Sequence, residues 1–223
     1  MSCRLCFATA CFLAVVFSLP AQDQSVFEPR SAARLSYFEG DVQIDAEPAV
    51  TGQLIAYGAL VQTGNDSYAE VTIGTGNILR VQENTVIFVE ISDATRRVDL
   101  RTGGIGAVLN GLDRLSPSLE RSRPLFYLKT QGTVAGVRGT SFFAQVEGPG
   151  STYVCTCNGS LEFSGDGYSE FSTEYYHHGA RRFVSRPNGR VTVEIAPLLY
   201  HDDAEMNDLA ARIGETITWS EGY

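Results

Sequence analysis

The stretch AEVTIGTGNILRVQENTVIFV, residues 69–89, decides the fold class of this chain. Tight turns separate its three β-rich runs, which are Ala69–Ile73, Ile78–Val81 and Thr85–Val89. Gly74-Thr75-Gly76-Asn77 forms the first turn, where glycine and asparagine tolerate a positive φ. The same alternation extends from Ala33 to Ile195 without a helical period. Strands of about five residues with turns every 8 to 12 residues or so predict an all-β sandwich, barrel or solenoid.

The composition fits an all-β chain with an acidic surface. The 223 residues include 22 glycines, and valine, isoleucine, threonine and tyrosine are frequent, as in strands. There are 17 basic and 26 acidic residues, which gives a net charge of -9. Such a surface repels phosphate backbones, so we expect no nucleic-acid partner.

The first 21 residues have the pattern of a signal peptide. Arg4 supplies a positive start, Leu5–Leu19 an apolar run, and Leu19-Pro20-Ala21 a cleavage site. The run is too short for a membrane span of roughly 20 residues, although a retained anchor is an alternative. We therefore predict a signal peptide over 1–21, a linker over 22–32, and an exported protein of the periplasm or cell envelope with no stable membrane span once mature. Cleavage would remove one arginine and no acid, leaving 16 basic and 26 acidic residues, a net charge of -10.

Roughly 200 residues then remain, enough for one sizeable domain. We predict a β-domain over 33–195 and a helix with a tail over 196–223. Asp202 can cap this one short α-helix, Glu205 completes the capping-box spacing, and Gly214 ends it. Its apolar stripe consists of Met206, Leu209, Ala210 and Ile213.

Residues 129–143, KTQGTVAGVRGTSFF, look like the signature strand pair of FecR domains, the periplasmic modules of iron-responsive cell-surface signalling proteins. Other segments follow in the family's order: Gly40-Asp41-Val42, Gly58–Gly64, Leu100–Gly104 and Gly159–Phe163. The resemblance covers roughly Ala33 to Phe163. It implies a FecR-like β-sandwich, prism or solenoid of many short strands. Because the chain begins with a leader instead of the sigma-regulator segment of full transducers, we expect a stand-alone exported FecR module.

The signature itself reads as two β-runs, Leu125–Thr130 and Thr140–Val146, joined by a glycine-rich connection. Its glycines permit tight bends and close backbone approach. A later hairpin is also expected, in which Pro187-Asn188-Gly189 joins 182–184 to 191–193 as antiparallel neighbours.

The chemistry of the chain is concentrated after this signature. Cys155 and Cys157 flank Thr156 on an expected strand, so both sulfurs should project from the same face. A disulfide between them is at the outer edge of usual geometry, because extended i and i+2 residues lie about 6.5 to 7 Å apart. Three histidines follow, at 177, 178 and 201.

These residues predict a metal site with the ligands Cys155, Cys157, His177, His178 and His201. Two thiolates and two imidazoles form a tetrahedral zinc set, and the same ligands can hold iron or copper. On a strand only one of the adjacent histidines would meet the sulfurs, whereas in a turn before Gly179 both would converge. His201 precedes the helix, whose positive dipole end favours a neutral, coordinating ring. A redox-active or structural thiol pair is the alternative.

The sequence thus favours a non-enzymatic, exported binding module of the cell envelope with a Cys/His metal or thiol redox site. No nucleophile elbow or paired-carboxylate spacing indicates catalysis. The alternative is a structural or protein-interaction module without metal, whose partner is an envelope protein. Such a module would bind through sheet edges or through the loop at 110–124, which carries Arg114, Arg121 and Arg123.

Overall fold

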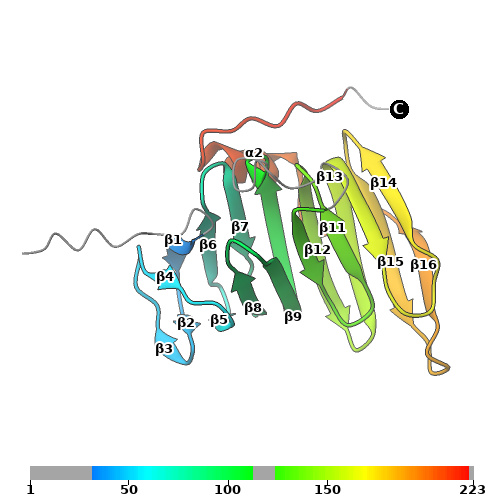
Figure 1. Cartoon of the computed structure of the whole chain (residues 1–223), viewed down its shortest axis with the longest axis horizontal. Coiled ribbons are helices and arrows are strands. Elements are labelled where there is room, and N and C mark those ends of the chain that lie inside the picture. Colours follow the sequence, from blue (N-terminus) through cyan, green and yellow to red (C-terminus); the bar gives the residue numbers. More distant parts are fainter. Residues whose placement is uncertain (1–31, 113–123, 221–223) are drawn as a thin grey trace, which may run out of the picture.

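The computed structural model describes residues 32–112 and 124–220. The predicted signal peptide, all but the last residue of the predicted linker, and Arg114, Arg121 and Arg123 lie outside these residues. Sixteen strands and one helix form in the described part, which confirms the all-β fold with a short C-terminal helix (Figure 1). Among the described residues no helix is long and apolar enough to cross a membrane.

The strands form two sheets that share their longest members, β9 and β13. Sheet A has the order β4 (Leu54–Ile55), β1 (Ala33–Glu39), β6 (Tyr68–Ile73), β7 (Asn77–Val81), β9 (Arg96–Leu109), β12 (Ser141–Gly148), β13 (Ser151–Ser164), β15 (Gly179–Ser185) and β16 (Val191–Ala196). Sheet B has the order β3 (Glu47–Pro48), β2 (Val42–Ile44), β5 (Ala59–Thr63), β8 (Val86–Ile91), β9, β10 (Phe126–Lys129), β11 (Val134–Val137), β13 and β14 (Phe171–Tyr175). All pairs are antiparallel except β9 with β10.

The two shared strands pass from one sheet to the other at glycines. Residues 96–102 of β9 pair in sheet B and 103–109 in sheet A, with Gly103 at φ 73°. Residues 151–158 of β13 pair in sheet A and 159–164 in sheet B, with Gly159 at φ 111°. A side chain at Gly103 would also meet the Thr85 hydroxyl at 2.1 Å. Glycine therefore allows the change of direction that lets one strand serve both sheets.

Most of the predicted strands are confirmed. The runs 69–73 and 78–81 lie in β6 and β7, and 85–89 overlaps β8. The late hairpin also forms, because β15 and β16 pair antiparallel with Phe183 opposite Val193.

The signature segment differs from the expected pair of strands. Its glycine-rich connection is itself a strand, β11, which pairs with β10 and β13 in sheet B. The two flanking strands, β10 and β12, belong to different sheets and do not pair with each other. Gly136 makes room for this arrangement, because a Cβ there would lie 2.5 Å from Cγ of Pro124.

Two apolar layers hold the fold together. The larger layer lies between the sheets and includes Val71, Leu100, Phe126 and Phe163. The smaller layer covers the outer face of sheet A, where Ile78, Val108 and Phe143 pack against the C-terminal helix. The central strands of sheet A are therefore buried on both faces, as the unbroken burial of residues 152–157 shows.

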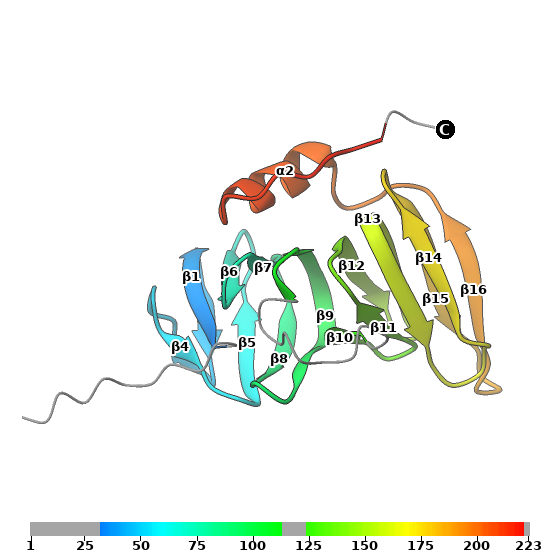
Figure 2. The ribbon, with the colours of Figure 1, turned by 45° about the horizontal axis from the view of Figure 1, so that its top comes forward.

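The helix, α2 (Asp203–Ala211), lies over the upper part of the sheet in both views (Figures 1 and 2). Asp202 accepts a hydrogen bond of 2.9 Å from the backbone N–H of Glu205, which confirms the predicted cap. Met206, Leu209 and Ala210 are buried against sheet A, and Ile213 packs beside them. Gly214 follows with φ 71°, in the left-handed conformation that ends many helices.

Candidate metal centre

Both cysteines lie on β13 and point to the outer face of sheet A. Their side chains are fully buried in the layer beneath the C-terminal segment. Thr156 points the other way, and its hydroxyl lies 2.7 Å from that of Thr173. The expectation that the two sulfurs share a face is therefore correct. Both are free thiols.

His178 reaches Cys155 from the turn between β14 and β15. It adopts a positive φ of 46°, and its N–H donates a hydrogen bond of 3.1 Å to the carbonyl of Cys157. Its Nδ1 lies 3.6 Å from Sγ of Cys155, and its Nε2 lies 2.6 Å from Oδ1 of Asp203. The next residue must be small, because a Cβ at Gly179 would lie 2.1 Å from the ring of Tyr175. The turn thus places one imidazole between a thiol and a carboxylate.

His201 approaches the other thiol from the segment before α2. Its Nε2 lies 3.2 Å from Sγ of Cys157, and its Nδ1 lies 2.9 Å from the carbonyl oxygen of Leu199. The ring stacks on Phe143 with 4.5 Å between centroids and an interplanar angle of 6°. His201 is only 8% exposed, so packing holds the ring in this orientation.

His177 does not reach the sulfurs. Its ring is exposed, and its Nε2 lies 3.1 Å from Oδ2 of Asp203. The candidate ligand group therefore consists of Cys155, Cys157, His178 and His201. His177 belongs to a second candidate group, with His178 and Asp203. The turn brings the two adjacent histidines to one carboxylate, while only the second reaches a thiol.

The four sulfur and nitrogen atoms lie close enough together to share one ion. All lie within 4.8 Å of one another. Zinc bonds of about 2.3 Å to sulfur and 2.05 Å to nitrogen, at tetrahedral angles, place a sulfur and a nitrogen roughly 3.6 Å apart. The two sulfur–nitrogen distances here are 3.6 and 3.2 Å. The cluster could therefore hold a metal ion.

The outer contacts of both histidines suit coordination. When a neutral imidazole donates its one N–H, its other nitrogen keeps a lone pair. Nε2 of His178 can donate to Asp203, and Nδ1 of His201 can donate to the carbonyl of Leu199. Each ring then turns its free lone pair toward a sulfur. Metal-binding histidines in proteins usually have such an outer carboxylate or carbonyl partner.

The thiols and His178 influence one another's protonation. The hydrogen bond with Cys157, opposed by burial and reinforced by His178 and His201, lowers the pKa of Cys155 well below its usual range. Burial and the interaction with Cys155 raise the pKa of Cys157. Burial opposes protonation of His178, but hydrogen bonds with Cys155 and Asp203 outweigh it and raise the pKa of His178. One thiolate is thus favoured at neutral pH, and the thiolate is the form that binds metals.

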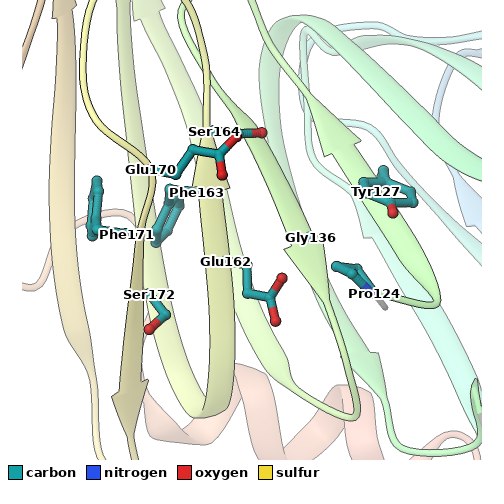
Figure 3. A pocket seen from close by; sticks show the side chains of 9 residues that line it. All are labelled: Pro124, Tyr127, Gly136, Glu162, Phe163, Ser164, Glu170, Phe171 and Ser172. Atoms are coloured by element: carbon teal, nitrogen blue, oxygen red, sulfur yellow. The ribbon is translucent and has the colours of Figure 1, made fainter. Parts of the chain in front are cut away.

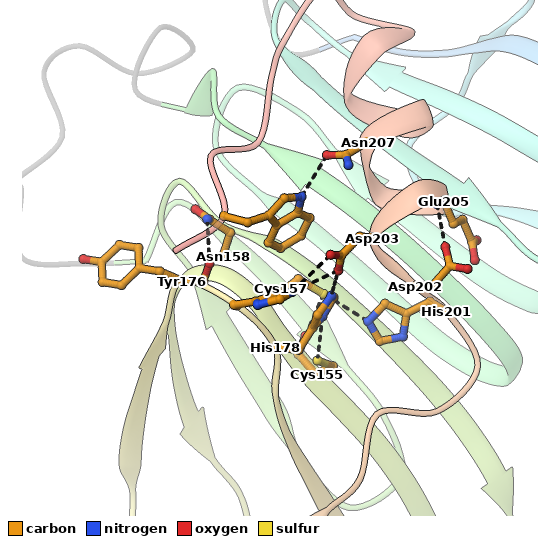
Figure 4. A network of polar contacts seen from close by, with 12 residues as sticks. Cys155, Cys157, Asn158, Tyr176, His178, His201, Asp202, Asp203, Glu205 and Asn207 are labelled. Atoms are coloured by element: carbon orange, nitrogen blue, oxygen red, sulfur yellow. Dashed lines mark hydrogen bonds and ion pairs between the residues drawn. The ribbon is translucent and has the colours of Figure 1, made fainter. Parts of the chain in front are cut away.

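The tail after α2 returns to cover the cluster (Figure 4). Trp219 stacks on His178 with 5.0 Å between ring centroids, and its indole N–H donates to Asn207 at 3.0 Å. Asn158 donates to the carbonyl of Thr218 at 2.7 Å. Sequence reasoning missed the roles of Asp203 and Leu199. A carboxylate in the first helical turn, two residues after His201, was the available signal for Asp203.

A separate pocket of about 430 Å³ lies on sheet B (Figure 3). The pocket crosses four neighbouring strands of sheet B, β10, β11, β13 and β14. The residues that lie side by side across them are Tyr127, Gly136, Glu162 and Ser172. The missing side chain at Gly136 leaves a gap between the tyrosine and the glutamate, which Pro124 partly fills. The thiols and imidazoles lie on the outer face of sheet A and take no part in this pocket.

Comparison with known proteins confirms the family. Residues 59–162 match the family model described as FecR protein. The predicted resemblance to FecR domains is therefore confirmed over these residues, and both cysteines lie within them. No curated protein matches the chain.

Two crystal structures of a candidate anti-sigma factor from Parabacteroides distasonis ATCC 8503 are similar to this chain. Their identities are 16% and 14%, and the TM-score is 0.46 in both cases. The similarity covers 61% of this chain and 59% of the other, so the chain spans less than two thirds of the length of that protein.

Proposed function

We propose that this protein is an exported, non-enzymatic FecR-family module of the cell envelope that binds a metal ion at Cys155, Cys157, His178 and His201. The main support for the metal site is that each imidazole has partners on both sides of its ring. One ring nitrogen of each faces a sulfur, and the other faces an oxygen of Asp203 or Leu199. The family points to a regulatory role that involves other proteins, so an envelope protein is the partner we expect.

Metal content tests the site. The wild type, the Cys155→Ser/Cys157→Ser double variant and His177→Ala are purified without chelator, loaded under reducing conditions with Zn²⁺, Fe²⁺ or Cu⁺, and assayed by elemental analysis. We expect about one ion per chain in the wild type and in His177→Ala, and none in the double variant. His177→Ala is the matched control, because it removes a neighbouring imidazole that does not face a thiol. Near-zero metal in the loaded wild type would show that the proposed site does not bind metal.

Export has its own test. The leader pattern supports cleavage after Ala21. Mass spectrometry of the protein recovered from the envelope fraction of an exporting host should give an N-terminus at Gln22. Recovery of the intact chain from the cytoplasm would contradict export.

The second candidate is an interaction module without metal. It is favoured by the same sulfur–nitrogen distances, because a hydrogen bond between each imidazole and its sulfur accounts for them without an ion. It predicts capture of the same envelope partner with or without chelator and in the Cys155→Ser/Cys157→Ser variant. Capture that disappears in both cases would favour the metal-binding module.

A further inference from the structure

The C-terminal segment, residues 197–220, forms a third layer on the protein. It includes α2 and the returning tail, and it covers the outer face of sheet A (Figure 2). Beneath it lie large apolar side chains, among them Phe143 and Tyr153, each no more than 1% exposed. If the segment left, this face of the sheet would become an exposed apolar patch.

The segment reaches the cysteines and their histidines at three points. His201 faces the sulfur of Cys157, Asp203 accepts from His178, and Trp219 stacks on His178. Three of the four ligands come from the β-domain, and the fourth, His201, comes from the segment. An ion at this centre would therefore connect the C-terminal segment to the β-domain by coordinate bonds.

The segment also has attachments that need no ion. They are buried apolar side chains, such as Ile217, and hydrogen bonds, such as those that join Leu199 to Tyr153 and Thr218 to Asn158. An isolated helix in water needs about 12 to 15 residues, so α2, with nine, depends on docking for its order. Two ion pairs join the helix and its C-cap to the strands, Arg80 with Asp208 and Glu70 with Arg212. In each pair the partner on the segment is at least 42% exposed, and exposed pairs contribute little. The buried side chains of Met206, Leu209 and Ala210 are the main attachment of the helix itself. A metal ligand at His201, two residues before α2, would add a coordinate bond at the start of the helix, where docking gives the helix its order.

We infer that the ion is zinc and that its binding fastens the C-terminal segment to sheet A. The inference rests on the proposed metal site and adds the identity of the ion and its role. Four protein ligands, two sulfurs and two nitrogens, leave no position for water or substrate, and three of the four residues are buried. This is the pattern of a structural tetrahedral zinc site. Coordination releases to solvent whatever thiol proton the pair still holds and changes no oxidation state. Loss of zinc breaks the bond at His201 and loosens the segment that covers sheet A.

Hydrogen exchange by mass spectrometry tests the fastening on the full chain. Exchange is measured for residues 197–220 and for β9 and β12, after chelation and again after one equivalent of Zn²⁺. We expect chelation to speed exchange in 197–220 by roughly tenfold or more and to leave the strands protected, with zinc reversing the change. His201→Ala should show fast exchange in 197–220 with or without zinc, and His177→Ala should behave like the wild type.

The outcomes separate the fastening from the metal site. If zinc binds in a 1:1 ratio but exchange in 197–220 does not change, the fastening is wrong and the metal site stands. If no metal binds, the proposed site fails. Co²⁺ substitution of the wild type provides a readout that needs no variant, because tetrahedral cobalt–thiolate coordination absorbs strongly in the visible range. A protein that takes up iron with a coloured cluster, or copper in preference to zinc at equal supply, would overturn the identity of the ion.

Discussion

Asp203 offers the sharpest test of how the proposed site is built. Its carboxylate lies 2.6 Å from Nε2 of His178, on the side of the ring away from the thiol. Loss of such an outer partner usually lowers metal affinity by about 10 to 100-fold, or roughly 1.4 to 2.7 kcal/mol. Asp203 is 44% exposed, whereas the His178 side chain is 8% exposed. Solvent can replace part of the lost contact, so we expect Asp203→Ala to weaken zinc binding by about 10 to 30-fold.

Two further variants separate the hydrogen bond from the charge. Asp203→Asn removes the charge but keeps an oxygen that can accept from His178, so its loss should be smaller than that of Asp203→Ala. Asp202→Asn removes the same charge from the same helix end and retains a good N-cap, so it should bind zinc like the wild type. Affinities are measured at pH 7.5 under reducing conditions by competition with a chromophoric chelator. The reasoning is refuted if Asp203→Ala binds within twofold of the wild type, or if Asp202→Asn loses as much.

Three other predictions concern stability and are made on the metal-free protein. Arg80→Met should lower the free energy of unfolding by denaturant by about 3 kcal/mol. Glu70, which is 2% exposed, loses its ion pair of 2.6 Å and keeps the longer one of 3.7 Å to Arg212; a loss under 1 kcal/mol would contradict this. Glu147→Gln should cost about 1 to 2 kcal/mol at pH 7, since Arg182 holds the pKa of Glu147 below its usual range. A carboxylate with a depressed pKa stabilises the fold at pH values above its pKa in the unfolded chain, about 4.3. The difference in unfolding free energy between Glu147→Gln and the wild type should therefore shrink as the pH falls below about 4.3. A difference that stays constant with pH would refute the assignment. Gly179→Ala should lower the melting temperature, because its methyl group would collide with the ring of Tyr175. An unchanged melting temperature would show that the ring moves at no cost.

The local features of this fold were predictable because they depend on neighbours in the sequence. Alternation and turn residues predicted the strands, and the i, i+2 spacing placed both thiols on one face. The cap at Asp202 followed from its spacing to Glu205. Each of these features is determined within a few residues of the chain.

The remaining features depend on contacts between distant segments. β11 was missed because glycine-rich segments read as bends, and its strand state comes from pairing with β10 and β13. The choice of His178 over His177 depends on a positive φ that the sequence pattern did not reveal. The burial of β12 and β13 on both faces did have a signal, since Phe142-Phe143-Ala144 is apolar at successive positions. Strands with such runs need cover on both sides.

The position of Trp219 gives the protein a built-in optical probe. It is the only tryptophan of the chain, so all indole fluorescence comes from this one ring. The ring lies against His178 and its N–H is bonded to Asn207 on α2. Its emission wavelength and intensity therefore report the immediate surroundings of the cysteines and not an average over the molecule. A titration in a fluorimeter can follow events at this corner of the protein without any label.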